Sequence, residues 1–295
     1  MSDQSASSLL LGLSAGLAAI VRDVAPSLVS VQSPRMRSTG FSWRPGLIVA
    51  AENALADDGE PSIVAHDGAS SSAHVVGRDP STDVALLRIE RIDLPKAPPI
   101  ATAPATGALA VVAGAREGAA TAALGVVSFV GPQWRSLRGG VIDARIELDA
   151  ALAGASEGGL ALDASGQALG MAVFGPRRRT LVIPMTTIDR VAEQLATKGR
   201  IARGYLGLGL QPVKLDGGGT GAMTTSVDPK GPGAAAGVRQ GDIIVAWNGE
   251  PIRGVHQLVR ALGPDSVGAR VGLTLHRGGE PIETTLTIGE RPEGQ

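Results

Sequence analysis

Cysteine is absent from this chain of 295 residues, and aromatic residues make up only 2% of it. Without cysteine the protein has no disulfide and no thiolate metal site, but this does not indicate a compartment, because such a chain folds equally well in reducing or oxidising surroundings. Net charge is also nearly absent, since 27 Lys and Arg oppose 28 Asp and Glu. Nucleic acid and anionic membrane surfaces are therefore disfavoured as partners.

The remaining composition describes a globular protein. Hydrophobic residues make up 43% of the chain, which at this length is enough for two domains, each with its own core. The 41 glycines and 19 prolines imply many turns and favour a mainly β protein. No dinucleotide-binding loop, Walker motif or metal-binding histidine pair occurs in the sequence. We therefore expect no cofactor and no metal.

The first segment, 1–25, contains the apolar run LLLGLSAGLAAIV at 9–21. We predict a helix here, ended by Pro26. No Lys or Arg precedes the run, whereas a secretory signal begins with positive charge. It is also shorter than the ~20 apolar residues of a membrane span, so no span is expected. A remnant of an export signal or anchor is the alternative.

Residues 26–187 contain many short runs that are β-branched or alternate in hydrophobicity, bounded by Gly, Pro, Asp or Ser. They lie at 27–33, 40–43, 46–51, 62–67, 72–79, 84–90, 108–114, 123–130, 142–149, 159–163, 168–173 and 180–184. So many strands with little helix between them predict closed barrels. A helix is predicted at 186–200, with Gly199 as its stop, and its part 188–200 is expected to link two domains.

The last part, 201–292, is predicted to be a second, α+β domain. Its RGYLGLGLQPV strand, the stretch GPGAAAGVRQGDIIVAWNGEPI, a helix at 254–263 and a hairpin at 270–289 together resemble a PDZ domain of the bacterial type found after a protease. In that family, backbone N–H groups of a loop bind the terminal carboxylate of a peptide, which adds as a strand beside the helix. The resemblance assigns peptide binding to Tyr205, Leu206, Gly207, Leu208, Leu258 and Leu262. The alternative is that these leucines only fill a small core.

With this domain, the whole chain resembles the HtrA/Deg family, in which a trypsin-like double six-stranded β-barrel precedes a PDZ domain. The resemblance covers 14–291, and VVGRDPSTDVALLRI and IELDAALAGASEGGL match the family's aspartate segment and serine loop. Asp83 and Ser156 therefore fall at the positions of the catalytic acid and nucleophile. Where the family has LIVTNAHVV, this chain has LIVAAENAL, which places Asn53 at the histidine position.

Asparagine cannot replace the catalytic histidine. A serine hydroxyl becomes an effective nucleophile only when a base takes its proton, and the same base later protonates the leaving amine. Asn53 has no protonation change near neutral pH. Glu52 is adjacent, but two carboxylates beside each other repel, and one would stay protonated. His66 and His74 are predicted to be ordinary strand or turn histidines.

The serine loop departs from the family as well. The family's GNSGGP reads GASEGG here, so Glu157 follows Ser156 where glycine is expected. Backbone N–H groups of Gly154 and Ser156 could still form an oxyanion hole, although the extra carboxylate would oppose a developing negative charge. GASEG also fits the G-x-S-x-G elbow of α/β-hydrolases, but that fold requires a helix directly after the serine, and a hairpin is predicted here.

These observations favour an inactive protease homologue that binds unfolded or C-terminal peptide segments in protein quality control or regulation. Self-association and mixed assembly with an active relative are the two assemblies that we consider, and the second would regulate that relative. The alternative is an active serine endopeptidase with a non-standard base, and a third possibility is a PDZ groove closed by its own chain. His256 is a candidate to tune ligand choice, and the arginines at 177–179 suggest a preference for acidic segments. The compartment is cytoplasmic if the N-terminus is native and periplasmic by family habit.

Overall fold

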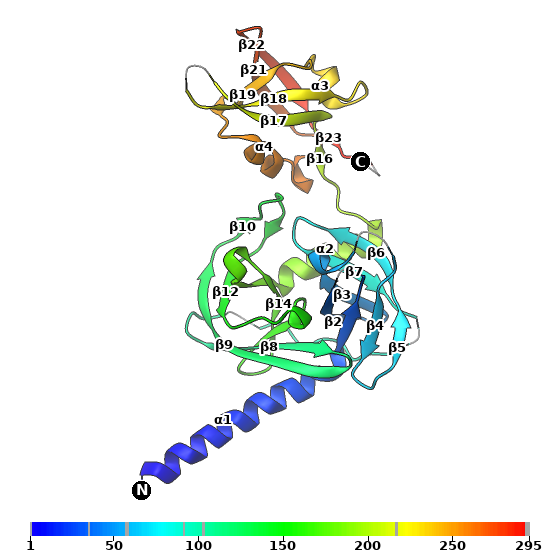
Figure 1. Ribbon diagram of the computed structural model, residues 1–295, viewed down its shortest axis with the longest axis vertical. Coiled ribbons are helices and arrows are strands. Elements are labelled where there is room, and N and C mark those ends of the chain that lie inside the picture. The colour runs from blue at the N-terminus through cyan, green and yellow to red at the C-terminus, as the bar shows by residue number, and fades with distance from the viewer. Residues whose placement is uncertain are drawn as a thin grey trace. The chain divides into compact units, whose positions relative to one another are not determined.

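The protein is described by a computed structural model covering residues 2–34, 36–56, 59–90, 92–101, 104–215 and 218–292. The chain divides into two compact units (Figure 1). The first unit comprises 1–134 and 142–200, and the second comprises 135–141 and 201–295. The segment 135–141 lies within the range expected of the first domain, and Arg135 forms an ion pair of 2.8 Å with Asp265 inside the second unit.

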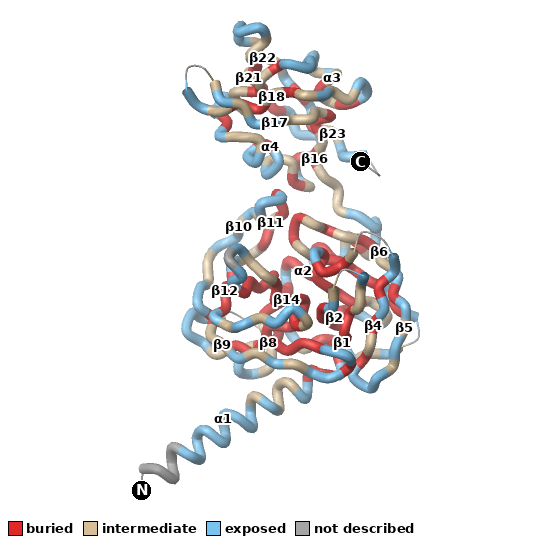
Figure 2. Tube along the Cα trace, viewed as in Figure 1, coloured by how far each residue is buried: buried red, intermediate tan, exposed pale blue. Residues whose placement is uncertain are grey.

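The chain begins with helix α1 (Ser2–Val24), followed by the 3-10 turn η1 (Ala25–Ser27), where Pro26 stops the α-helix. Leu9, Leu10 and Leu11 are more than two-thirds exposed, and only the last turns of the helix pack against the barrel (Figure 2). The predicted helix is present and longer than 9–21. By length and composition it could cross a membrane, a test that a signal sequence near the N-terminus also passes.

The first sheet of the first unit is antiparallel, with strand order β5-β4-β1-β2-β3-β7-β6. Its strands are β1 (Leu28–Gln32), β2 (Arg37–Arg44), β3 (Leu47–Ala51), β4 (Ser62–Ala65), β5 (Ser70–Ser72), β6 (His74–Asp79) and β7 (Val84–Arg88). The expectation of six strands was wrong by one. Three serines form the additional strand β5, which pairs with β4 and carries no hydrophobic pattern that sequence analysis could detect.

The second sheet of this unit is a closed six-stranded barrel in the order β12-β15-β14-β13-β8-β9, as predicted. Its strands are β8 (Leu109–Arg116), β9 (Ala119–Gly131), β12 (Arg145–Asp149), β13 (Leu160–Asp163), β14 (Ala168–Phe174) and β15 (Thr180–Pro184). Short elements between the strands of this barrel are β10 (Trp134–Arg135), β11 (Val141–Ile142), η3 (Gly154–Ser156) and η4 (Pro176–Arg178). The 3-10 turn η2 (Glu52–Ala54) lies between β3 and β4 of the first sheet. Small and branched side chains fill the core of the barrel, because aromatics are scarce.

Helix α2 (Met185–Lys198) packs its apolar face on the strands of the first unit. Ile188, Val191 and Leu195 are buried at helical spacing, and Gly199 ends the helix in the left-handed conformation, with φ of 70°. Trp43 donates a hydrogen bond of 2.6 Å from its Nε1 to Asp189. The helix therefore closes the first unit as well as leading out of it.

The second unit is built on a sheet in the order β17-β18-β19-β21-β22, with β20 beside β19, and on a two-stranded ribbon of β16 and β23. Its strands are β16 (Gly204–Tyr205), β17 (Leu208–Lys214), β18 (Thr220–Val227), β19 (Ile243–Trp247), β20 (Glu250–Pro251), β21 (Arg270–Arg277), β22 (Glu280–Thr287) and β23 (Gly289–Glu290). Its helices are α3 (Pro232–Ala235), α4 (Val255–Ala261) and the 3-10 turn η5 (Pro264–Ser266). Strand β17 is a sheet edge, and α4 packs near it.

Truncation of Leu160 should test the hydrophobic core of the first unit. Leu160 in β13 is 0% exposed, so Leu160→Ala should lower the free energy of unfolding by about 2–5 kcal/mol through lost burial and a residual cavity. Leu137→Ala is the control, because Leu137 is 68% exposed and its loss should change little. Urea denaturation measures both. Equal effects of the two substitutions would contradict the assigned core.

Candidate functional site

Asp83 is placed by a tight turn at the start of β7. The buried carboxylate of Asp79 accepts hydrogen bonds from the Ser81 and Thr82 side chains and from the Ser81 N–H, which fixes the turn. Asp83 follows with φ of 61°, in the left-handed region that Asp tolerates better than most residues. This backbone conformation aims its carboxylate at η2.

Asn53 lies in η2 and is hydrogen-bonded to Asp83. Its backbone N–H donates to Asp83 Oδ1 over 2.8 Å, and its side-chain amide acts to lower the pKa of that carboxyl group. The Glu52 N–H donates to the Asp83 carbonyl over 3.2 Å. The structure therefore brings together the residues at the histidine and aspartate positions, but with an amide in place of an imidazole.

The hydroxyl of Ser156 is hydrogen-bonded to the hydroxyl of Thr121. Ser156 is buried in η3, and its Oγ lies 3.0 Å from Oγ1 of Thr121 on β9. Thr121 sits in the run AATAA, where no motif distinguishes it. Only the pairing of β8 with β9, which sets Thr121 opposite Gly114, brings it to the serine loop. Sequence analysis therefore missed this contact.

Close packing leaves no room for a side chain at Gly114. A Cβ there would lie 2.8 Å from Thr121 Oγ1, 2.9 Å from Thr39 Oγ1 and 3.1 Å from Ser156 Cα. Thr39 on β2 also donates from its hydroxyl to the Ala155 carbonyl and from its N–H to the Glu157 carbonyl, both over 2.7 Å. The serine loop is thus fixed to both sheets.

The predicted oxyanion hole is occupied by the chain itself. The Ser156 N–H donates to the Ala153 carbonyl over 2.9 Å, which forms the 3-10 turn η3. An oxyanion would have to displace this carbonyl to receive the same N–H. In the observed conformation, the Gly154 and Ser156 amides do not both converge on a reacting atom.

Acidic side chains surround Asp83. Burial raises the pKa of the Asp83 carboxyl from 3.8 to about 7, against the hydrogen bond from the Asn53 N–H, and the charges of Glu157 and Glu52 raise it further. Glu157 is 6% exposed and Glu52 is 9% exposed. At neutral pH the site therefore holds a partly protonated acid beside other carboxyl groups, whereas a catalytic triad keeps its aspartate ionised against an imidazolium.

The other candidate bases are engaged elsewhere. Glu52 lies 3.9 Å from the Arg78 guanidinium. His66 Nδ1 is 3.2 Å from the Gly118 carbonyl, and His74 Nδ1 is 3.1 Å from exposed Glu60. The remaining two histidines belong to the second unit. No cluster of three or more His, Cys, Asp or Glu that could hold a metal ion occurs among the described residues.

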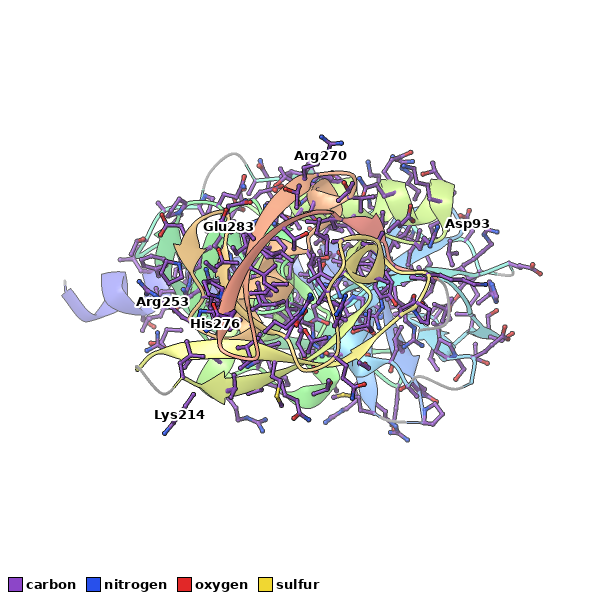
Figure 3. The ribbon with its side chains drawn as sticks, turned by 90° about the horizontal axis from the view of Figure 1, so that it is seen from above. Asp93, Lys214, Arg253, Arg270, His276 and Glu283 are labelled. Atoms are coloured by element: carbon purple, nitrogen blue, oxygen red, sulfur yellow. The ribbon has the colours of Figure 1, made fainter. Side chains whose placement is uncertain are left out.

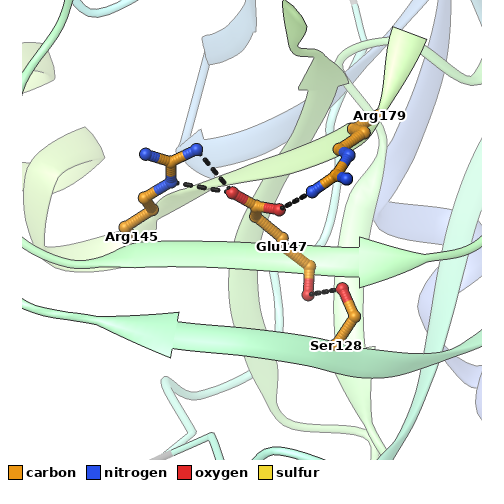
Figure 4. A network of polar contacts seen from close by, with 4 residues as sticks. All are labelled: Ser128, Arg145, Glu147 and Arg179. Atoms are coloured by element: carbon orange, nitrogen blue, oxygen red, sulfur yellow. Dashed lines mark hydrogen bonds and ion pairs between the residues drawn. The ribbon is translucent and has the colours of Figure 1, made fainter. Parts of the chain in front are cut away.

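Glu147 forms the centre of a charge network with Arg145 and with Arg179, the last of the three arginines at 177–179 (Figure 4). Its buried carboxylate accepts from Arg145 Nε over 2.7 Å and from Arg179 Nη1 over 3.0 Å, which keeps its pKa below the usual range despite burial. Arg178 stacks over the Phe174 ring, with its guanidinium carbon 4.9 Å from the centroid. The Arg177 side chain lies outside the described residues. Arg179 is therefore paired with Glu147, and the preference for acidic segments stays a prediction.

The second unit carries an apolar cavity of about 330 Å³. Its lining residues are Arg203, Gly204, Tyr205, Leu206, Gly207, Leu208, Leu210, Val255, Leu258, Val259, Leu262 and Arg291. All six residues expected to bind peptide are in this set. His256 is exposed and does not line the cavity; Val255 and Val259 of α4 line it instead.

Backbone geometry orients the loop before β17. The Leu206 carbonyl accepts from the Gly233 N–H over 2.7 Å, and the Gly207 carbonyl accepts from the Asp228 N–H over 2.8 Å. In a trans peptide, the carbonyl of one residue and the N–H of the next point in opposite directions. The N–H groups of Gly207 and Leu208 are therefore turned away from these partners. Gly207 permits this with φ of 69°.

Comparison with known families agrees with this division. Residues 38–171 match a trypsin-like peptidase domain, and 204–288 match a PDZ domain. A probable periplasmic serine endoprotease, DegP-like, of Brucella suis biovar 1 is 31% identical over 282 residues, covering 88% of this chain and 54% of the relative. The crystal structure of the serine endoprotease from Yersinia pestis superposes with a TM-score of 0.67 at 26% identity, covering 94% of this chain and 98% of that one.

The chain is similar to HtrA-type serine proteases over most of its length. Its predicted fold, a trypsin-like barrel domain followed by a PDZ domain, is confirmed. The HtrA-type protease AlgW with a decapeptide has the same fold, with a TM-score of 0.67 at 20% identity over 94% of this chain and 99% of that one. A DegP-like protein of Chlamydia trachomatis serovar D is 31% identical over 280 residues, 88% of this chain and 55% of the relative. This chain therefore spans about half the length of these curated relatives.

The pKa of Asp83 predicts a pH dependence of stability. Because the pKa of Asp83 is about 7 in the folded protein and near 4 in an unfolded chain, the carboxyl group loses its proton at lower pH in the unfolded state. The free energy of unfolding should therefore fall between about pH 4 and pH 7 and then level off. Asp83→Asn should remove this fall, as measured by urea denaturation at several pH values. Glu90→Gln, at an exposed carboxyl, is the control, and unchanged pH dependence in Asp83→Asn would contradict the assignment.

Proposed function

We propose that this HtrA homologue is a protease-like scaffold that has lost turnover. The observation that carries the proposal is the pairing of Asn53, rather than a histidine, with Asp83, while the Ser156 hydroxyl is bonded to Thr121. No group in this arrangement can take the serine proton and return it to a leaving amine. Loss of the histidine alone costs about 2 × 10⁶-fold in turnover in a well-studied serine protease.

Two further features of the serine loop support lost catalysis. The Ser156 N–H donates a hydrogen bond to the Ala153 carbonyl, and Glu157 adds a buried carboxylate next to Ser156. Both oppose stabilisation of an oxyanion. An active endopeptidase with a non-standard base is the second candidate, but its possible bases, Glu52, His66 and His74, each have another partner.

The retained activity in this proposal is peptide binding by the PDZ domain. Peptides add to PDZ domains as a strand at a sheet edge, and β17 is such an edge beside α4. The cavity is lined by leucines and valines suited to apolar side chains. The N–H groups of Gly207 and Leu208 point away from the residues that bind the neighbouring carbonyls of the loop. The biological role would be to hold exposed or C-terminal segments of proteins, or to regulate an active relative by mixed assembly.

The periplasm is the compartment that we propose for this protein. Its relatives from Brucella suis and Chlamydia trachomatis are named as probable periplasmic proteins, and the apolar helix α1 has the length and composition of an export segment. Fractionation of cells that express the chain would test this. Recovery in the cytoplasm alone would contradict it.

Restoration of the missing groups tests the loss of turnover. The native chain should neither cleave casein nor react with a fluorophosphonate probe. Asn53→His alone should gain little, because the carboxylate of Glu157 still opposes the developing negative charge of an oxyanion. Asn53→His combined with Glu157→Gly should gain labelling that disappears when Ser156→Ala is added. Cleavage by the native chain that is abolished by Ser156→Ala would sink the proposal and favour the active endopeptidase.

A charge introduced into the groove tests peptide binding. Val259 is 41% exposed and lines the cavity, so Val259→Glu should weaken peptide binding at least about tenfold by placing a carboxylate among apolar groups, while the fold is kept. His256→Glu adds the same charge to the same helix outside the cavity and should have little effect. Fluorescence polarisation with labelled decapeptides measures both. Equal loss in the two variants would contradict binding in this groove.

A further inference from the structure

Arginine and aromatic side chains meet at one face of the first unit. The chain has only three Trp, one Tyr and three Phe residues, yet two of these rings contact the same cation. The guanidinium carbon of Arg145 lies 6.0 Å from the centroid of the Phe129 ring and 5.6 Å from that of the Trp134 ring. Phe129 is 45% exposed. Scarce aromatic rings are therefore placed beside a cation at the surface and not in a core.

Strand pairing in the closed barrel builds this face. Glu147 on β12 pairs with Phe129 on β9 on one side and with β15 on the other. Its neighbour Ile146 packs in the barrel core, so the alternation of side chains along a strand turns Glu147 outward. Arg145 lies two residues before Glu147 on the same strand and therefore faces the same side. Three strands thus contribute to one outward surface.

One buried carboxylate holds two guanidinium groups on this surface (Figure 4). The Glu147 carboxylate lies 2.6 Å from Arg145 Nη2 and 3.0 Å from Arg179 Nη1. The Glu147 side chain is 7% exposed, whereas those of Arg145 and Arg179 are 46% and 66% exposed. One carboxylate can neutralise only one of two cations, and each guanidinium carries five N–H donors. The network therefore presents a net positive charge and further donors to the outside.

Arg178 adds a third cation in the adjacent turn η4. It is exposed, and its guanidinium carbon lies 4.9 Å from the centroid of the Phe174 ring. Its φ of 59° lies in the left-handed region, which is unfavourable for a residue with a long side chain. Strained backbone of this kind is concentrated at sites that bind ligands. The turn therefore holds its arginines in a particular arrangement.

We propose that this surface docks an acidic segment of a partner polypeptide. Its members, which we call the arginine surface, are Phe129, Trp134, Arg145, Arg178 and Arg179. Within the described part of the chain, Glu147 is the only acid that pairs with these arginines. Charge complementarity therefore favours a ligand with carboxylates, which guanidinium groups bind through paired hydrogen bonds.

The composition of the surface and of the whole chain favours a polypeptide over a long polyanion. Tryptophan and arginine are enriched among the residues that dominate protein–protein interfaces. The nearly balanced charge of the chain gives no long-range field for nucleic acid, so recognition depends on local contacts. None of the residues of the arginine surface lines the cavity of the second unit, and the inference does not rest on the proposed peptide-binding function.

Two uncharged-end peptides test the docking in the full chain. Decapeptides of alternating Glu and Gly, or of alternating Gln and Gly, carry an N-terminal fluorescein and a C-terminal amide. The native chain should bind the Glu peptide at least about tenfold more tightly than the Gln peptide in fluorescence polarisation at low ionic strength. Added salt should reduce this ratio, because exposed charges are screened.

Charge-removing variants locate the site. Arg178→Gln combined with Arg179→Gln should weaken binding of the Glu peptide about fivefold, while Arg145 remains to neutralise Glu147. Arg253→Gln combined with Arg270→Gln removes the same charge from two exposed arginines of the second unit, labelled in Figure 3, and should change little.

Thermal unfolding of both double variants shows whether each remains folded. If the first does not, Arg178→Gln decides, because Arg178 pairs with no acid among the described residues, and unchanged binding in it would overturn the inference.

The outcomes separate this inference from the proposed function. Val259→Glu, which should close the apolar groove, should leave binding of the Glu peptide unchanged. Loss of that binding in Val259→Glu would assign it to the second unit and overturn the arginine surface. Equal binding of the Glu and Gln peptides, binding of neither, or equal loss in the two double variants would also overturn it. Displacement by inorganic polyphosphate of equal charge at a lower concentration than by unlabelled Glu peptide would overturn the assignment to polypeptides.

Discussion

The double attachment of the serine loop to Thr39 is the constraint on which the catalytic region depends. One residue of β2 holds the Ala155 carbonyl with its hydroxyl and the Glu157 carbonyl with its N–H, so the first sheet fixes a loop of the second barrel. With the loop fixed in this way, the Ser156 hydroxyl reaches Thr121 and its N–H reaches Ala153. The loop that carries Ser156 is therefore held by contacts from both sheets.

The acidic character of the site follows from the same packing. A histidine between Asp83 and Ser156 would carry a positive charge during catalysis and would lower the pKa of the aspartate. Asn53 supplies hydrogen bonds but no charge, and Glu157 and Glu52 add negative charge, so the Asp83 pKa rises to about 7. A carboxyl that is partly protonated at neutral pH cannot support an imidazolium, and the substitutions at Asn53 and Glu157 therefore act in the same direction.

The two units divide structure and recognition between them. In the first unit the polar groups around Ser156 are engaged by one another, whereas the second unit has an apolar cavity beside outward-turned amides. This contrast is the physical basis for proposing peptide binding at the PDZ domain and not at the first unit. The arginine surface beside Glu147 would act differently, because it would bind by charge and not by strand addition.

The sequence by itself determined the mainly β fold, the barrel and PDZ domains and the substitution of Asn53, because alternating strands, turn residues and linear motifs are local properties. It did not reveal β5, whose serines have no hydrophobic pattern, nor the contact of Thr121 with Ser156 or of Arg179 with Glu147. Those depend on strand pairing between separate segments of the chain, such as β8 with β9 and β12 with β15. Only the tertiary structure decides which side chains such pairings bring together, because strand register and long-range closure are not encoded in any single window of residues.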